Sequence, residues 1–353
     1  MASQLISKSN IVCRLTLIDG VSIFFIVLFH EMGNFDRPDS LFLSKYLGIF
    51  GLILFTFSSG FKMIFNHSDE ISNKSFLSKY FIKRFIKLYK AYIGYTILAF
   101  IPLYCVIYLA TFHFKLNVWG TNHFWNNLNL EGLLNIIAGD NFVDSALWYL
   151  IALIIITFVC FTILYYFSLP TLFYFSLALI IFDVIFWDNL NPGSDNVYHA
   201  SLLFKVMIYM PAYIFGILFG YKKFYSNNKG LLHIFSILFA AQFLFSILFP
   251  NNILHKYDIL LYGFTLPPFM FLVSTILLGN NYIKKSLFIF GSYSFQIYLL
   301  HMPVILPVST RLVRDIFKMN YFITPYLMTI GIIIICISTY KVFKKIKLNT
   351  LFE

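Results

Sequence analysis

Apolar stretches of about 20 residues, separated by short polar segments, recur along the whole chain. A helix that crosses a membrane needs about 20 mostly apolar residues at a rise of about 1.5 Å per residue. Ten stretches meet this requirement and predict spans at residues 15–34, 43–65, 86–111, 146–167, 170–187, 203–221, 231–249, 257–279, 286–308 and 322–343. The pattern therefore predicts an all-α, polytopic integral membrane protein with about ten transmembrane helices.

The polar segments between these stretches are too short to form further domains. We expect residues 1–347 to form a single membrane-embedded domain and residues 348–353 to form a short C-terminal tail. The first apolar stretch ends in His30 and Glu31 rather than in the small residues of a cleavage site. The first span is therefore expected to remain in the mature protein.

Basic residues gather in alternate polar segments. Lysine and arginine in short loops mark the cytoplasmic side of a membrane protein, and with ten spans both termini share one side. Eighteen of the 26 basic residues fall on that side, whereas eleven of the fifteen acidic residues fall on the other. We therefore expect both termini to be cytoplasmic.

Composition and net charge narrow the class of protein further. Hydrophobic residues make up 59% of the chain and charged residues 12%, against about 45–50% and about 25% in soluble proteins, so a soluble fold is excluded. The net charge of +11 lies in short clusters; membrane lipids, and no nucleic acid, are the expected partners. Glycine-rich phosphate loops, a GxSxG elbow and zinc-ligand spacings are absent, which disfavours an ATP-driven pump, a serine hydrolase and a metal site.

Asp19 and His30 are ionisable residues within the first predicted span, where such side chains are costly and are functional candidates. Asp19 and His30 are 11 residues apart, which places them within about 20° of the same helix face and roughly 16 Å apart. One interpretation is a shared polar groove in which His30, followed by Glu31, acts as a general base at the outer end. The other is that Asp19 caps the helix at the cytoplasmic interface and His30 reaches the outer interface.

A basic segment lies immediately before the third predicted span. Arg84 and Lys87 are three residues apart, so their side chains project from neighbouring positions of a helix. Such a pair can hold a phosphorylated cosubstrate, because arginine offers a bidentate fork and lysine a point charge. The alternative is a topology signal that contacts lipid head groups.

The ninth predicted span concentrates polar side chains on one face. Ser294, Tyr298 and His301 follow the i, i+4, i+7 spacing of a helix. A polar stripe within a span faces protein or water rather than lipid. Substrate binding and hydrogen bonding between helices both remain open for these residues.

In this order the segments resemble the acyltransferase-3 family of integral membrane O-acyltransferases. Asp19 stands where that family usually has arginine, Lys87 replaces a second arginine, and Lys90 replaces a proline. The resemblance rests on five motifs, namely the first helix ending in His30, FxxSG at 55–61, the basic segment at 83–92, LWFL at 147–150 and SxxxYLxHxP at 294–303.

The resemblance implies an enzyme that moves an acyl group, expected to be acetyl, from cytoplasmic acetyl-CoA to a hydroxyl of an extracytoplasmic acceptor. Acetyl-CoA is then a cosubstrate and no cofactor stays bound. The expected acceptor is a cell-surface polysaccharide or its lipid-linked precursor, and the expected location is the cytoplasmic membrane. The chain resembles the stand-alone members of the family, which lack an extra hydrolase-like domain.

The resemblance also implies roles for individual residues. His30 is the expected catalytic residue, and Arg84 and Lys87 are expected to bind the acyl-CoA donor. The expected substrate-binding residues are Glu31, Trp148, Ser294, Tyr298 and His301. The alternative function is a glycan or lipid exporter that uses the same polar groove without acyl-transfer chemistry.

Overall fold

The computed structural model is almost entirely helical in the residues that it describes, which are 8–33, 38–65, 67, 69–70, 73–96, 129–131, 147–190, 201–221, 228–249, 258–307, 324–345 and 347. No β-strand occurs within these ranges, and the all-α class is confirmed. The predicted tail at 348–353 and residues 97–111 of the third predicted span lie outside the described residues.

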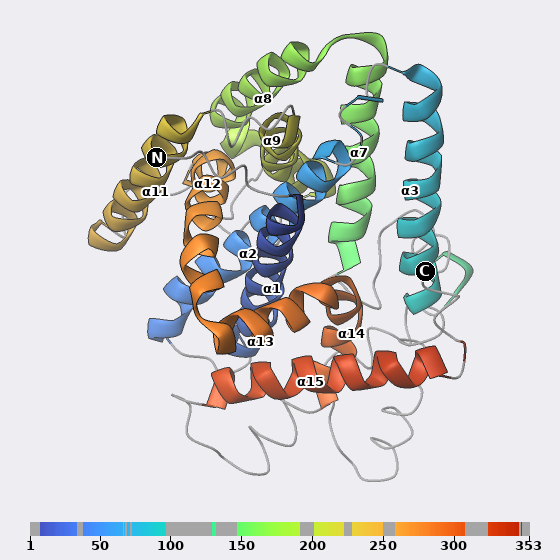
Figure 1. Cartoon of the computed structure of the whole chain (residues 1–353), viewed down its shortest axis with the longest axis vertical. Coiled ribbons are helices and arrows are strands. Elements are labelled where there is room, and N and C mark those ends of the chain that lie inside the picture. The colour runs from blue at the N-terminus through green and yellow to red at the C-terminus, as the bar shows by residue number, and fades with distance from the viewer. Residues whose placement is uncertain are drawn as a thin grey trace.

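Eleven helices make up most of the described part of the chain (Figure 1). They are α1 (Lys8–Gly33), α2 (Pro38–Phe65), α3 (Lys74–Tyr95), α7 (Trp148–Tyr166), α8 (Leu169–Leu190), α9 (Leu202–Gly220), α11 (Lys229–Leu248), α12 (Asp258–Gly279), α13 (Asn281–Ser292), α14 (Ser294–Pro307) and α15 (Thr324–Lys345). Eight of the helices in these described ranges are long and apolar enough to span a membrane, namely α1, α2, α7, α8, α9, α11, α12 and α15. The chain is therefore a polytopic membrane protein.

The eight spanning helices divide into an interior and a periphery. The apolar segments of α2 and α9 are each 83% buried inside the protein, whereas those of α8 and α11 are only 17% and 22% buried. Apolar side chains that do not pack against protein require lipid as their solvent. The interior therefore forms around α2 and α9, with α1 and α12 packed against them, and α8 and α11 present apolar faces to the bilayer.

Glycines allow the interior helices to approach closely. A Cβ atom at Gly60 of α2 would overlap the carbonyl oxygen of Tyr213 in α9, and one at Gly216 of α9 would overlap that of Phe57 in α2. Small residues at crossing points are the usual means of close helix packing in membranes, where lipid offers no hydrophobic driving force. The position of α2 is thus fixed from its α9 side.

The third predicted span begins earlier than expected. Helix α3 starts at Lys74, after Asn73, whose side-chain Oδ1 accepts hydrogen bonds from the backbone N–H groups of Ser75 (3.0 Å) and Phe76 (3.3 Å). Such a cap satisfies backbone donors at the start of a helix, and a search for apolar residues cannot detect it. The basic segment at 83–92 therefore lies within α3, which packs against α7 (Figure 1).

The prediction of one continuous span at 286–308 is wrong. The chain turns at Tyr293, which separates α13 from α14. Helix α13 carries Lys284 and Lys285 and exposes most of its side chains, whereas α14 buries its first two turns. The turn lets α13 stay at the surface while α14 enters the interior.

Candidate functional site

A cavity of about 380 Å³ opens between α1, α2, α3 and the α13–α14 turn. We call it the cationic cavity. Its polar lining includes Asp19 of α1, Ser58, Ser59 and Lys62 of α2, and Arg84 and Lys87 of α3. Ser292, Ser294 and Gln296 line it from the α13–α14 side, and Phe55 adds an apolar wall. Residues from distant parts of the sequence therefore meet in one cavity.

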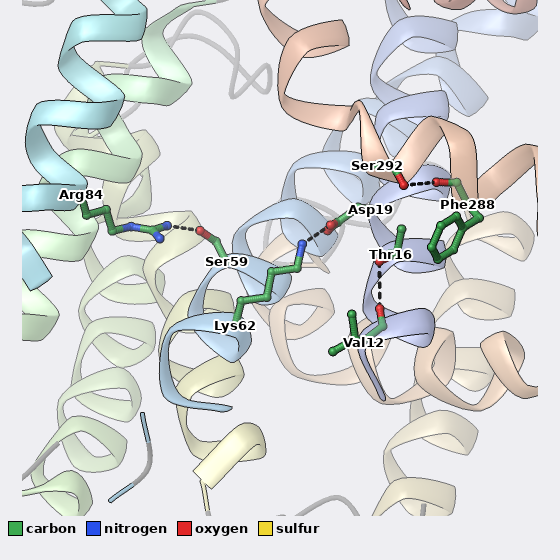
Figure 2. Close-up of polar contacts among 8 residues, drawn as sticks. All are labelled: Val12, Thr16, Asp19, Ser59, Lys62, Arg84, Phe288 and Ser292. Atoms are coloured by element: carbon green, nitrogen blue, oxygen red, sulfur yellow. Dashed lines mark hydrogen bonds and ion pairs between the residues drawn. The ribbon is translucent and has the colours of Figure 1, made fainter. Parts of the chain in front are cut away.

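An ion pair joins α1 and α2 at this cavity. The Nζ of Lys62 donates a hydrogen bond to Oδ2 of Asp19, as Figure 2 shows. The Asp19 side chain is 6% exposed and that of Lys62 is 45% exposed. Asp19 lies in the middle of α1 rather than at its start, so the interpretation of this residue as a helix cap is wrong.

Arg84 brings a second cation to the cavity. Its guanidinium reaches across from α3 and donates a hydrogen bond to Oγ of Ser59 (Figure 2). The Nε of Arg84 and the Oγ of Ser58 are buried and have no hydrogen-bond partner among the described residues. A buried polar atom without a partner is costly, so a ligand that supplies oxygen atoms would improve the energetics here.

The charge of the cavity favours an anion. Lys62, Arg84 and Lys87 contribute three positive charges, and Asp19 is the only carboxylate among the lining residues that the structure describes. Arginine and lysine at close range recognise phosphate groups through charge-assisted hydrogen bonds. The cavity is therefore suited to a phosphorylated ligand.

Two histidines meet further along the same helices. The ring centroids of His30, from α1, and His301, from α14, lie 5.1 Å apart at an interplanar angle of 46°. Nδ1 of His301 lies 2.5 Å from the carbonyl oxygen of Tyr298. A carbonyl oxygen only accepts hydrogen bonds, so Nδ1 carries the proton and Nε2 of the neutral ring is an acceptor. This Nε2 is buried without a hydrogen-bond partner within the described ranges, so its lone pair is available as a hydrogen-bond acceptor.

Three aromatic rings connect the cavity with the histidine pair. Phe55, Tyr149 and Tyr298 form a triangle with centroid separations of 6.0, 6.1 and 5.7 Å. We call these rings the aromatic triad. Phe55 lines the cationic cavity, and the Tyr298 ring lies 5.6 Å from that of His301. The hydroxyl groups of Tyr149 and Thr56 are hydrogen-bonded at 2.7 Å, which fixes the triad against α2.

A further aromatic and cationic contact adjoins the triad. Trp148, at the start of α7, packs edge to face with Tyr149, with 5.9 Å between ring centroids. The Nζ of Lys205 lies 4.6 Å from the centroid of the Trp148 ring, and Tyr209 packs against that ring at 5.9 Å. Lys205 is largely buried. A cation over an indole face is stabilised by the ring quadrupole, so Trp148 and Lys205 form one unit.

The residues that the sequence analysis singled out lie in two regions, the cationic cavity and the histidine pair with its adjoining aromatic triad. Arg84, Lys87 and Ser294 line the cationic cavity, while Tyr298 and His301 lie at the triad and the histidine pair. The predicted stripe of α14 thus connects both regions. Glu31 is fully buried at the end of α1.

Several residues of these regions escaped the sequence analysis. In the sequence, Lys62 is one of the eighteen basic residues on the predicted cytoplasmic side, and no pattern assigns a site role to Tyr149 or Lys205. A usable signal exists for α2, where Phe55, Ser59 and Lys62 follow the same i, i+4, i+7 spacing that identified the stripe of α14. No such pattern marks Lys205, because its partner Trp148 lies on another helix.

Comparison with known proteins identifies the family of the chain. The family model described as an acyltransferase domain, that of the acyltransferase-3 family, matches residues 14–341. Neither the curated proteins nor the solved structures contain a significant match to the chain. The family match includes both the cationic cavity and the histidine pair, and it extends over nearly the whole sequence. The chain therefore belongs to the acyltransferase-3 family and is a membrane acyltransferase.

Proposed function

We propose that the protein transfers an acetyl group from acetyl-CoA on the cytoplasmic side to a hydroxyl group of a cell-surface polysaccharide, or of its lipid-linked precursor, across the cytoplasmic membrane. One observation carries the proposal: the same two helices, α1 and α14, take part in both the cationic cavity and the histidine pair. An anionic donor and a hydroxyl acceptor can therefore bind at separate sites that α1 and α14 connect.

The cationic cavity is the proposed donor site. Coenzyme A carries several phosphate groups, and Arg84, Lys87 and Lys62 offer three cations to them. The unpartnered Ser58 hydroxyl and Arg84 Nε supply further hydrogen-bond donors. The clustering of basic residues in the predicted cytoplasmic loops agrees with a donor that arrives from the cytoplasm. The thioester end of the donor then extends past Phe55 toward the histidine pair.

His30 is the proposed general base. As the acceptor oxygen attacks the carbonyl carbon of the thioester, a ring nitrogen of His30 takes the hydroxyl proton. A C–O bond forms and the C–S bond breaks. His30 then returns the proton to the departing sulfur, which leaves as the free thiol of coenzyme A. The products are an acetyl ester and coenzyme A, and the histidine regains its starting state.

The acceptor site is proposed to lie beside Trp148. Aromatic side chains with a polar neighbour suit ligands that have both an apolar face and hydroxyl groups. Trp148, Tyr209 and Lys205 provide this combination next to the aromatic triad. A sugar ring held there would present a hydroxyl toward the histidine pair.

The decisive experiment measures thiol release from acetyl-CoA by the full-length protein in detergent, with and without polysaccharide extracted from the cell surface. We expect release that depends on the acceptor, and mass spectrometry should find a gain of one acetyl group per modified sugar. A protein that only exports glycan or lipid would consume no acetyl-CoA. Comparison of the surface polysaccharide from cells with and without the gene identifies the modified hydroxyl.

A further inference from the structure

The Asp19–Lys62 ion pair occupies an unusual position for a structural salt bridge. It lies at the wall of an open cavity that also contains Arg84 and Lys87. The Asp19 carboxylate is buried on the α1 side, while the Lys62 ammonium is half-exposed toward the cavity. An ion pair that is open to water contributes little to stability. Its position suggests a role in what the cavity binds.

The two helices are already joined without this pair. The Ser22 hydroxyl of α1 donates a hydrogen bond of 2.6 Å to the carbonyl oxygen of Gly51 in α2. A Cβ atom at Gly51 would overlap Ile26, so α1 and α2 are in close contact there. The contact between the helices thus has its own hydrogen bond and close packing, and it does not depend on the charges of Asp19 and Lys62.

We propose that Lys62 is a third phosphate ligand for the donor and that Asp19 acts as an internal competitor for it. This inference rests on the proposed donor function of the cavity. In the empty protein the carboxylate holds the ammonium; in the loaded protein a phosphate oxygen takes the ammonium from it. Because the carboxylate is the one anion among the described lining residues, it also repels the incoming phosphates. Asp19 therefore sets an upper limit on donor affinity and favours product release.

The proposal predicts opposite effects for the two partners. Asp19→Asn removes a negative charge and releases Lys62 from this ion pair, so it should tighten coenzyme A binding by about 3–10-fold, equivalent to roughly 1 kcal/mol. Lys62→Gln removes a ligand and leaves Asp19 uncompensated, so it should weaken binding by about 10–100-fold. In the double variant the repulsion is gone, and affinity should lie above that of Lys62→Gln alone. A merely structural pair predicts loss of stability in both single variants with no change of affinity.

The experiment is isothermal titration of free coenzyme A into the full-length protein in detergent, with a thermal melting curve for each variant. Lys83→Gln is the matched control, because Lys83 is exposed on the same helix as Arg84 but does not line the cavity; its affinity should stay within about twofold of the wild type. Equal affinities of the wild type, Asp19→Asn and Lys62→Gln would overturn the inference while leaving the donor site intact. If Asp19→Asn does not fold, the affinity of Lys62→Gln for coenzyme A tests the inference, and an affinity equal to that of the wild type would overturn it. Absence of binding to the wild type would instead overturn the proposed donor, and the inference with it.

Discussion

His30 and His301 lie side by side but differ in what they can do. The His301 ring is fully buried, and its Nδ1–H is held by the Tyr298 carbonyl. The side chain of His30 is only partly buried, so an acceptor hydroxyl reaches it more easily. Under the proposed function, the Nε2 lone pair of His301 can accept a hydrogen bond from a substrate hydroxyl or from a protonated His30.

If His30 is the base, His30→Ala should lower turnover by about 10²–10⁴-fold. The KM for acetyl-CoA should change little, because His30 lies roughly 16 Å along α1 from Asp19 in the donor cavity. His30→Gln should do no better, since an amide hydrogen-bonds a hydroxyl but takes no proton from it. Steady-state thiol release, corrected for the amount of folded protein, measures both effects. Recovery of activity in His30→Gln would show that the residue only positions the acceptor.

Arg84 should contribute to donor affinity rather than to the chemical step. Arg84→Ala removes a charge-assisted contact of about 1.5–3 kcal/mol, so the Kd for coenzyme A should rise by about 10–100-fold. Arg84→Lys should recover only part of this loss, because lysine lacks the bidentate fork. Titration calorimetry measures both variants, with Lys83→Ala as the exposed control. An unchanged Kd in Arg84→Ala combined with Lys87→Ala would identify the segment as a topology signal alone.

Among the site residues, the sequence predicts those that are neighbours along a single helix. Arg84 with Lys87, and the α14 stripe, were predicted from spacing alone. The pairing of Asp19 with Lys62 was not, because the two residues are 43 positions apart and meet only through the packing of α1 on α2. A charge reversed against the family pattern is a signal that such a partner exists, but it does not identify the partner.

Among the helices, α2 both lines the cationic cavity and packs against the interior helix α9. One face of it carries Phe55, Ser59 and Lys62 into the cationic cavity, and another face carries Gly60 against α9. A shift of α2 would therefore move the cationic cavity and with it the proposed donor site. Its close contact with α9 is the feature that keeps the cavity in place.

Gly60→Ala should destabilise the protein by about 1–3 kcal/mol, because its Cβ atom would overlap the backbone of α9 and force the helices apart. The matched control is Gly230→Ala in α11, where a Cβ atom meets no other atom within 4 Å. Thermal melting in detergent should show a lower Tm for Gly60→Ala and no decrease for Gly230→Ala. Equal melting temperatures would mean that α2 and α9 separate without cost.

Helix boundaries were predictable only where they coincide with a change in hydropathy. The start of α3 depends on the Asn73 cap. The turn at Tyr293 depends on packing, because α13 lies at the surface and α14 enters the interior. Both features arise from hydrogen bonding and packing, to which a search for apolar stretches is blind. The helices α7, α9 and α12 are apolar over most of their length and lie close to the predicted limits.

For the whole molecule, apolar content was sufficient to predict a polytopic helical membrane protein. Bilayer hydrocarbon accepts only backbone whose hydrogen bonds are satisfied internally, so long apolar stretches become helices. The number of spans is a harder problem. The predicted span at 286–308 is divided by a turn into α13 and α14. The predicted span at 86–111 overlaps only the end of α3, and its residues 97–111 lie outside the described residues.

The orientation predicted from the basic residues is open to a direct test. Single cysteines are introduced at Ser75, in a predicted cytoplasmic segment, and at Asn127 and Asn191, in predicted outer loops, after the four native cysteines are replaced by alanine. A membrane-impermeant maleimide added to intact cells should label Asn127→Cys and Asn191→Cys but not Ser75→Cys. Permeabilised cells provide the control, in which all three sites should react. Labelling of Ser75→Cys from outside would reverse the donor and acceptor sides.

The aromatic triad has a consequence for the cell as well as for the reaction. A protein that admits an anion from one side and a sugar from the other risks becoming a channel that dissipates the proton gradient. Phe55, Tyr149 and Tyr298 stand between the cavity and the histidine pair, where apolar rings hinder the entry of water. In proteoliposomes that contain a pH-sensitive dye, we expect the wild type to hold a proton gradient and Phe55→Gly to discharge it faster. On the proposed function, the triad then acts as an electrical seal that keeps the bilayer insulating during acyl transfer.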